Sequence, residues 1–262
     1  MKRLGCILSG LLFAFPALAQ SSSVFIEDLT WTEVRDAIAA GKTTAIYYAG
    51  SIEQNGPGMA LGKHLFLAHY IAGQIAQQLG DALVYPTMPF APVGDPLKKT
   101  GHMRFPGSTS VSEATFEGVA RDVALSAISA GFKNVVMMCD HGGGQNGLKK
   151  VAAEMNQEWG AKGVHVYYIP DLYYKEKEQM RDYLTKHKMR IDQHAGVDDT
   201  SEVMFIDRDR KWIRKDKLAP DDGKMGVNGD PTQATPSLGK MFIDFKIQDA
   251  VAQVRSLTKS KP

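Results

Sequence analysis

Histidine and carboxylate side chains gather in three polar segments of the chain. Their members are Glu53 and His64 in the first segment, His141 in the second, and His194, Asp198 and Asp199 in the third. Imidazole nitrogens and carboxylate oxygens are ligands that zinc, manganese and iron accept in proteins. None of the segments contains an HExxH motif or a CxxC pair, so local spacing alone does not define a metal site.

His141 follows the most clearly predicted strand. Residues 135–138 (VVMM) form an unbroken apolar run, which is typical of a strand buried on both faces of a parallel sheet. Asp140, His141 and the glycines 142–144 come directly after it. Ligands of open α/β sheets bind beyond the carboxyl ends of the strands, and glycines allow backbone and substrate to approach closely. The pattern therefore predicts His141 at the mouth of a site. A structural histidine in a strand-to-helix turn is the alternative.

Strand and helix patterns alternate along the rest of the chain. We predict strands at 43–49, 82–88, 135–138 and 165–169, and helices at 28–41, 65–79, 112–130, 147–159, 171–190, from 202 onward and at 238–257. Residues 171–190 are strongly charged, which favours a solvent-exposed helix. Two long loops rich in glycine and proline, 90–110 and 223–239, are of a kind that is often functional. The alternation predicts a three-layer α/β/α fold with a mostly parallel sheet.

The first 19 residues have the pattern of a secretory signal peptide. Lys2 and Arg3 precede an apolar stretch that ends in the cleavage pattern of residues 17–19 (ALA). We therefore expect a single mature domain over 20–262, located in the periplasm or secreted. No later segment has the ~18 apolar residues of a membrane span. The net charge of +2 does not favour nucleic acid as a partner. Cys139 would be the only cysteine of the mature chain, so no internal disulfide is expected.

Five short segments form an ordered set of motifs. They are 50–64 (GSIEQNGPGMALGKH), 105–109 (FPGST), 131–132 (GF) leading to 139–143 (CDHGG), 194–201 (HAGVDDTS) and 226–235 (GVNGDPTQAT). In content and order they resemble the creatininase family of metal-dependent amidohydrolases. The resemblance covers most of the predicted mature chain. It implies a creatininase-like fold, hydrolysis of a carbon–nitrogen bond other than an ordinary peptide bond, and a homo-oligomer, usually a hexamer.

The resemblance also implies a set of metal ligands, with departures from the family pattern. The implied ligands are Glu53, His64, His141 and Asp199. Where the family has an aspartate that bridges two metals, this chain has His64, and Asp199 stands in place of a glutamate. A neutral imidazole has one acceptor lone pair and cannot bridge two cations. We therefore predict one divalent ion, zinc, manganese or iron.

By the same resemblance, His194 is the proton shuttle of the reaction. A histidine pKa near ~6.5 suits proton transfer in either direction. A surface pair of Asp192 with His194 is the alternative. The predicted nucleophile is a metal-activated water that attacks an amide, which is cyclic in some family substrates.

Five residues are predicted to bind the substrate. They are Asn55, His102, Arg104, Gly142 and Gly143, the two glycines through backbone amides that would stabilise an oxyanion. His102 and Arg104 would bind a substrate carboxylate or a neighbouring subunit. Asn55 and Gly58 replace two family histidines, so creatinine itself is not the expected substrate. The expected partner is a small amide of the exported compartment.

Two other hypotheses remain open at this point. Cys139 lies two residues before His141, and a thiolate there would be a nucleophile for a cysteine hydrolase. Alternatively, the chain is an exported small-molecule binding protein that keeps the fold and has lost catalysis, as its substituted family positions would allow. Metal content separates the metal-dependent hydrolase from the cysteine hydrolase, and turnover of amides separates it from the binding protein.

Overall fold

A four-stranded parallel sheet forms the middle layer of the protein. The structure is a computed structural model that describes residues 23–259. The strands are β1 (Thr44–Ala49), β2 (Ala82–Val84), β3 (Asn134–Cys139) and β4 (His165–Tyr168), in the order β2-β1-β3-β4. The two central strands end level with each other, because Ala49 pairs with Cys139. The segments that carry Glu53 and His141 therefore leave the sheet at the same edge.

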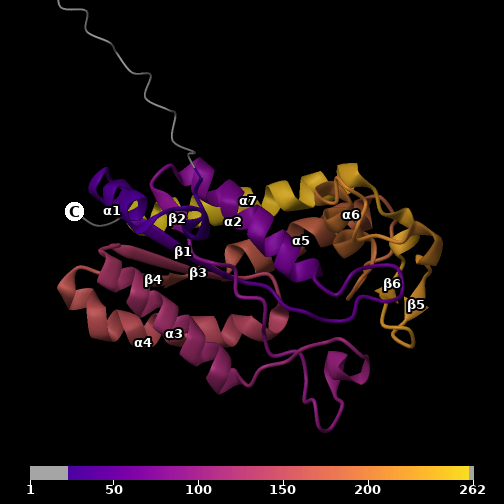
Figure 1. The fold of residues 1–262 in the computed structure, drawn as a ribbon. Coiled ribbons are helices and arrows are strands. Elements are labelled where there is room, and N and C mark those ends of the chain that lie inside the picture. The colour runs from indigo at the N-terminus through magenta and orange to yellow at the C-terminus, as the bar shows by residue number, and fades with distance from the viewer. Residues whose placement is uncertain (1–22, 260–262) are drawn as a thin grey trace, which may run out of the picture.

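Helices cover both faces of this sheet (Figure 1). The helices are α1 (Trp31–Ala39), α2 (Lys63–Leu79), α3 (Glu113–Ala130), α4 (Gln145–Trp159), α5 (Asp171–Lys186), α6 (Val197–Ile206) and α7 (Pro236–Lys259). One face packs against α3 and α4, and the other packs against α2 and α7. Val135 and Met137 of β3 belong to the first core, whereas Val136 and Met138 belong to the second. Burial on both faces explains the unbroken apolar run and confirms the three-layer α/β/α architecture.

Capping residues and glycines mark the ends of several helices at the predicted positions. Thr30 and Glu33 form a capping box at the start of α1, and the Ser112 side chain accepts a hydrogen bond from the Thr115 N–H at the start of α3. Gly80 and Gly131 follow α2 and α3 with φ of 84° and 110°, which is the left-handed conformation that ends many helices. A small antiparallel pair, β5 (Asp221–Asp222) and β6 (Asn228–Gly229), lies within the second long loop.

Three predicted elements differ from the structure. β2 ends at Val84, well before residue 88, since Pro86 has no N–H to continue a ladder. α6 begins at Val197, five positions before the predicted start at 202, so both aspartates of the third polar segment lie in its first turn. α5 ends at Lys186, before the predicted end at 190, and it is amphipathic, with one exposed face as predicted and one buried face. Its residues at four-residue spacing are buried, and these are Leu172, Glu176, Met180 and Leu184.

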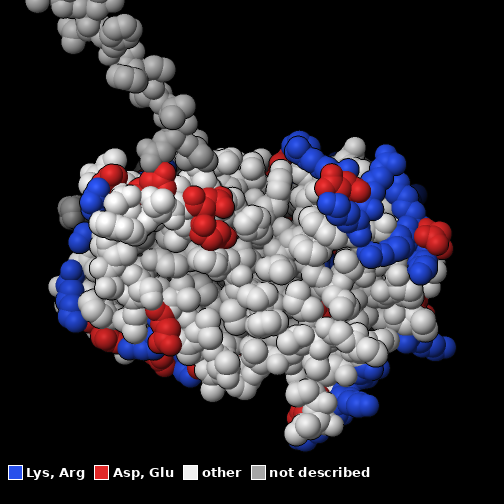
Figure 2. Space-filling view, in the orientation of Figure 1, with Lys and Arg blue, Asp and Glu red and all other residues white. Residues whose placement is uncertain are grey.

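Charged side chains are unevenly spread over the surface. Figure 2 shows Lys and Arg gathered at the end of the molecule that carries α6 and the β5–β6 pair, with few charges across the middle of the same face. On this face the largest group of basic side chains thus lies at one end. Among residues 23–259, no helix is both long and apolar enough to cross a membrane. The predicted signal peptide lies outside the described residues.

Gly50 follows β1 directly and packs closely against the first turn of α2. A Cβ at Gly50 would lie 2.7 Å from the His64 carbonyl oxygen and from the backbone of Leu65. Backbone atoms cannot rotate away, so Gly50→Ala should lower the free energy of unfolding by ~1–3 kcal/mol. Urea denaturation followed by circular dichroism measures this.

Gly118 provides the matched control, because it lies inside α3 and a Cβ there would have no atom within 4 Å. Gly118→Ala should raise stability by ~0.5–1 kcal/mol through helix propensity alone. A Gly50→Ala protein as stable as wild type would contradict tight packing of β1 on the start of α2.

Candidate metal centre

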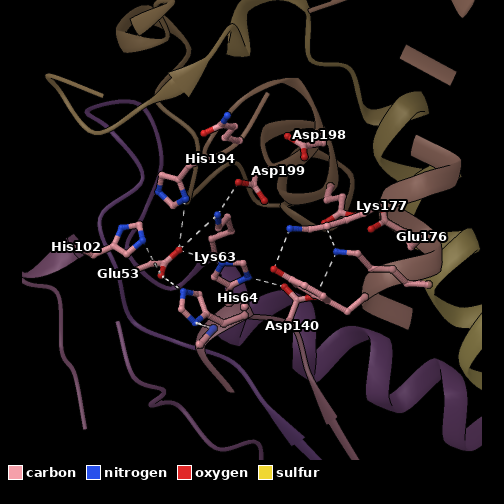
Figure 3. A pocket seen from close by; sticks show the side chains of 17 residues that line it. Glu53, Lys63, His64, His102, Asp140, Glu176, Lys177, His194, Asp198 and Asp199 are labelled. Atoms are coloured by element: carbon pink, nitrogen blue, oxygen red, sulfur yellow. Dashed lines mark hydrogen bonds and ion pairs between the residues drawn. The ribbon is translucent and has the colours of Figure 1, made fainter. Parts of the chain in front are cut away.

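A cavity of about 240 Å³ opens beyond the carboxyl ends of β1 and β3. Its walls come from the loop after β1, the first turn of α2, the turn after β3, and side chains of α5, α6 and α7 (Figure 3). Ligand pockets for drug-sized molecules occupy ~300–1,000 Å³, so this cavity suits a smaller group. The position beyond the strand ends is the one that the sequence predicted for His141.

Glu53 is the centre of the cavity's polar wall. Its side chain is fully buried, and five nitrogen atoms from different parts of the chain approach its carboxylate. They are Lys63 Nζ at 3.7 Å, His64 Nε2 at 3.0 Å, His102 Nε2 at 3.6 Å, His141 Nε2 at 2.8 Å and His194 Nδ1 at 3.7 Å. Burial by itself would raise the pKa of Glu53, but His64 and His141 outweigh it and hold the pKa well below its ordinary value. Glu53 is therefore ionised at neutral pH.

Three of these residues form a candidate metal site. Glu53, His102 and His141 each offer one ligand atom, and these atoms all lie within 4.8 Å of one another. The buried Glu53 Oε2 has no hydrogen-bond partner, although His141 Nε2 is only 2.8 Å away, so the two atoms are close without the geometry of a hydrogen bond. A buried oxygen without a partner beside two imidazoles fits a divalent cation.

Hydrogen bonds in the structure define which ring nitrogens carry protons. The Gly143 N–H donates to His141 Nδ1 at 3.0 Å, and the Gln54 side-chain amide contacts His102 Nδ1 at 3.1 Å. Gln54 Oε1 accepts from the Gly56 N–H, which turns the amide NH₂ toward His102. Both rings in their neutral form therefore hold the proton on Nε2. Binding of a metal at either Nε2 requires the proton to move to Nδ1 and these contacts to open.

His64, a predicted ligand, is held between two carboxylates. Its Nδ1 lies 2.6 Å from Asp140 Oδ2 and its Nε2 lies 3.0 Å from Glu53 Oε1. Burial and Lys63 lower the pKa of His64, but the carboxylates outweigh them and the net shift is upward. A protonated imidazole has two donors and no lone pair. In this arrangement both ring nitrogens of His64 face carboxylates, and its role as a metal ligand stays a prediction.

Asp199, the other predicted ligand, is paired with a lysine. Its Oδ2 accepts hydrogen bonds from Lys63 Nζ at 2.6 Å and from the Ala195 N–H at 2.7 Å. Burial opposes ionisation of Asp199, yet Lys63, His64 and His194 together lower its pKa. Asp199 thus lines the cavity as predicted, but its carboxylate is already bound by Lys63 and by the Ala195 N–H. His102, predicted for substrate, takes its place beside Glu53 and His141.

His194 has a free ring nitrogen that faces the site. Its Nε2–H donates to the Gln54 carbonyl at 2.8 Å, which leaves Nδ1 as an acceptor 3.7 Å from Glu53 Oε1. Burial, followed by the charge of Lys63, lowers the pKa of His194 to about 3, so the ring is neutral at pH 7. Asp192 does not pair with His194, since its carboxylate accepts from the Val197 and Asp230 N–H groups. The shuttle role of His194 stays a prediction.

The remaining predicted substrate residues divide into two groups. Gly142 and Gly143 line the cavity, but the Gly143 amide is already used by His141. Asn55 and Arg104 lie outside the cavity lining. Asn55 Nδ2 donates to the Glu53 and Ala60 carbonyls and so braces the loop, and Arg104 is exposed.

Sequence reasoning missed a network of buried charges in the wall of the cavity. Lys246 Nζ contacts Asp140 Oδ1 at 3.3 Å and Glu202 Oε2 at 2.7 Å. Burial raises the pKa of Glu202 to about 7, whereas Lys246 acts to lower it. The signal for Lys246 was present in the sequence, because it lies between Ile243 and Ile247 on the apolar side of α7.

Cys139 does not meet the requirements of a nucleophile. It is fully buried in the core on the α3 and α4 side, and it is not among the residues that line the cavity. Burial raises the pKa of its thiol to about 12, and Sγ donates to the His141 carbonyl. A thiolate is therefore strongly disfavoured there, which argues against the cysteine hydrolase.

The network of buried charges predicts a large loss of stability when its cation is removed. Lys246→Met leaves Asp140 and Glu202 buried without their shared partner, so the free energy of unfolding should fall by ~3–5 kcal/mol. Lys240→Met is the control on the same helix, since Lys240 pairs with Asp244 at the surface and should contribute ~0.5 kcal/mol or less. Equal effects of the two substitutions in urea denaturation would contradict a stabilising role of the buried ion pairs around Lys246.

Sequence comparisons find two relatives of known activity. A model of the family described as creatininase, creatinine amidohydrolase, matches residues 27–254. Creatinine amidohydrolase of Pseudomonas putida is 31% identical over 121 residues, a match that spans 46% of this chain and 46% of that protein, or about half its length. The mycofactocin precursor peptide peptidase of Mycolicibacterium smegmatis is 26% identical over 230 residues, 79% of this chain and 82% of that protein.

Solved structures share the fold. The crystal structure of a creatinine amidohydrolase superposes with a TM-score of 0.74 and 21% identity, over 90% of this chain and 98% of that one. A mutant creatininase described as Zn-Zn type gives 0.73 with 22% identity, over 90% and 98% of the two chains. A manganese form of creatininase gives 0.72 with 21% identity, over 89% and 98%. At this level of identity the likeness establishes the architecture alone.

Proposed function

Because this chain belongs to the creatininase family, we propose that it is a metal-dependent hydrolase of a carbon–nitrogen bond in a small amide. One observation carries the proposal. The buried Glu53 Oε2 has no hydrogen-bond partner and lies within reach of the imidazoles of His102 and His141 at the wall of a cavity. Relatives described with zinc or manganese support the same kind of site.

Each residue of the site has a role in this proposal. Glu53, His102 and His141 hold one divalent ion, which is zinc, manganese or iron. Such an ion, when bound, lowers the pKa of a water molecule and polarises a carbonyl group. His194 Nδ1, the acceptor that faces Glu53, takes up a proton and returns it to the leaving nitrogen. Because burial lowers its pKa to about 3, the ring begins in the neutral form, with Nδ1 free of a proton.

The substrate is an amide small enough for a cavity of about 240 Å³. One relative is named for creatinine and the other for a precursor peptide, so the family includes both cyclic amides and peptides as substrates. We favour a small amide, because the cavity has no room for several residues of a peptide. A terminal residue of a peptide would fit, and a substrate screen should include both classes.

Export and oligomerisation remain proposals as well. The periplasmic or secreted location depends on residues 1–19, outside the described part of the chain. A homo-oligomer is inferred from the family alone; Leu97 and Met225, which are 94% and 60% exposed, are available for such contacts. They lie on the two long loops, 90–110 and 223–239, that we expect to contact neighbouring subunits.

Metal content tests the proposed site directly. Mature wild-type protein purified without chelator should carry about one equivalent of zinc, manganese or iron, measured by inductively coupled plasma mass spectrometry. His141→Ala should lose most of this metal, because it removes one of three ligands. His187→Ala is the control, since His187 is exposed at the end of α5, outside the cavity lining. Wild-type protein without any of these metals would contradict the proposal.

Turnover of a panel of cyclic amides, linear amides and short peptides tests the alternatives. The metal-loaded wild type should hydrolyse at least one compound, and Cys139→Ala should keep that activity within about twofold, because the buried thiol has no access to the cavity. Loss of turnover in a folded Cys139→Ala protein would support the cysteine hydrolase. Full metal loading without turnover of any compound would favour the binding protein.

A further inference from the structure

Two buried carboxylates of the site share the ammonium group of Lys63. Lys63 Nζ lies 2.6 Å from Asp199 Oδ2 and 3.7 Å from Glu53 Oε1. Figure 3 shows the ammonium between the two acids, inside the cavity wall. The Lys63 side chain is 1% exposed, so the protein has removed it almost completely from water.

A lysine in this position needs an explanation. Lysine is almost never fully buried unless it is paired, because removing an ammonium from water costs several kcal/mol. Lys63 is the first residue of α2, and a side chain at a helix end can usually turn outward to solvent. Here it instead turns inward between Glu53 and Asp199. The acids therefore compensate the burial, and the position between them is one that favours a cation.

The two carboxylate oxygens of Glu53 face different groups of side chains. Oε2 faces His102 and His141, the candidate ligands of a metal. Oε1 faces Lys63 and His64, each of which also contacts a second carboxylate, and it lies 3.7 Å from His194 Nδ1. Lys63 therefore places a cation that belongs to the chain on this side of Glu53. The other side has the imidazoles of His102 and His141 and a buried oxygen without a hydrogen bond.

Carboxylate oxygens from two segments around one point are the donors that a divalent ion would use. We propose that Lys63 takes the place of a second metal ion in this site, its ammonium filling the position between Glu53 and Asp199, and that the chain consequently binds a single ion beside Oε2. The ammonium donates a hydrogen bond to Asp199 and lies close enough to Glu53 to balance its charge, but it has no vacant coordination position for a water molecule. This inference rests on the proposed function, which supplies the ion beside Oε2. It adds that Lys63 is the reason why the site holds one ion and not two.

Removing the side chain of Lys63 tests this. Lys63→Ala opens the space between two ionised acids, so bound zinc or manganese should rise from about one to about two equivalents, roughly a twofold increase in metal per chain. Equilibrium dialysis against each metal, followed by mass spectrometry, measures it. Lys177→Ala is the matched control, because Lys177 also lines the cavity but donates to the Tyr173 hydroxyl at 2.9 Å. It should leave the metal content unchanged.

The metal content of the wild-type protein distinguishes failure of this inference from failure of the proposed function. Two equivalents in wild type would overturn the role of Lys63 and leave the hydrolase intact. No metal in wild type would overturn the proposed function, and one equivalent gained by Lys63→Ala would still support Lys63 as the resident cation. A folded Lys63→Ala protein that gains no metal would overturn the inference.

A second variant covers the case in which Lys63→Ala fails to fold. If Lys63 and not a metal is the partner of Asp199, Asp199→Ala should retain the metal content of wild type, because it removes no ligand. Loss of the ion from folded Asp199→Ala protein would show that Asp199 coordinates it, and the inference would be wrong.

Discussion

The burial of the Glu53 carboxylate is the constraint around which the site is built. An ionised carboxylate removed from water costs several kcal/mol unless opposite charges and hydrogen bonds surround it. This chain meets the requirement with side chains from α2, from the long loop after β2, from the turn after β3 and from the segment before α6. Because β1 and β3 are adjacent and end level, these segments can converge on one carboxylate. The order of strands in the sheet is therefore what makes the charge arrangement possible.

The architecture and part of the site could be read from the sequence. Apolar runs such as 135–138 and caps such as Thr30 and Ser112 are local signals, so the layers and most element ends followed from them. Glu53, His141 and His194 were expected together and lie together. Lys63 and Lys246 were missed, because a lysine in a helical pattern ordinarily points to solvent. Their burial depends on acids far away in the sequence. The long loop likewise gave no signal that His102, and not Arg104, would turn toward Glu53.

Under the proposed function, the site would combine fixed cations of the chain with an exchangeable metal ion. Lys63 and His64 belong to the fold, and each is held by a second acid, Asp199 or Asp140. Removing one partner of such a buried pair is strongly destabilising, so these cations are part of what keeps the loop after β1 in place. A metal beside Oε2 would come and go without disturbing them.

The position of Lys246 near the C-terminus affects when the site can form during synthesis of the chain. It lies on α7, the last helix, yet its partners Asp140 and Glu202 belong to segments synthesised much earlier. Ribosomes add ~5–20 residues per second and domains tend to fold from the N-terminus. A nascent chain that ends before α7 would have to bury two acids with no cation to balance them. The cavity therefore cannot be completed before the final helix is made, because Lys246 itself forms part of its lining.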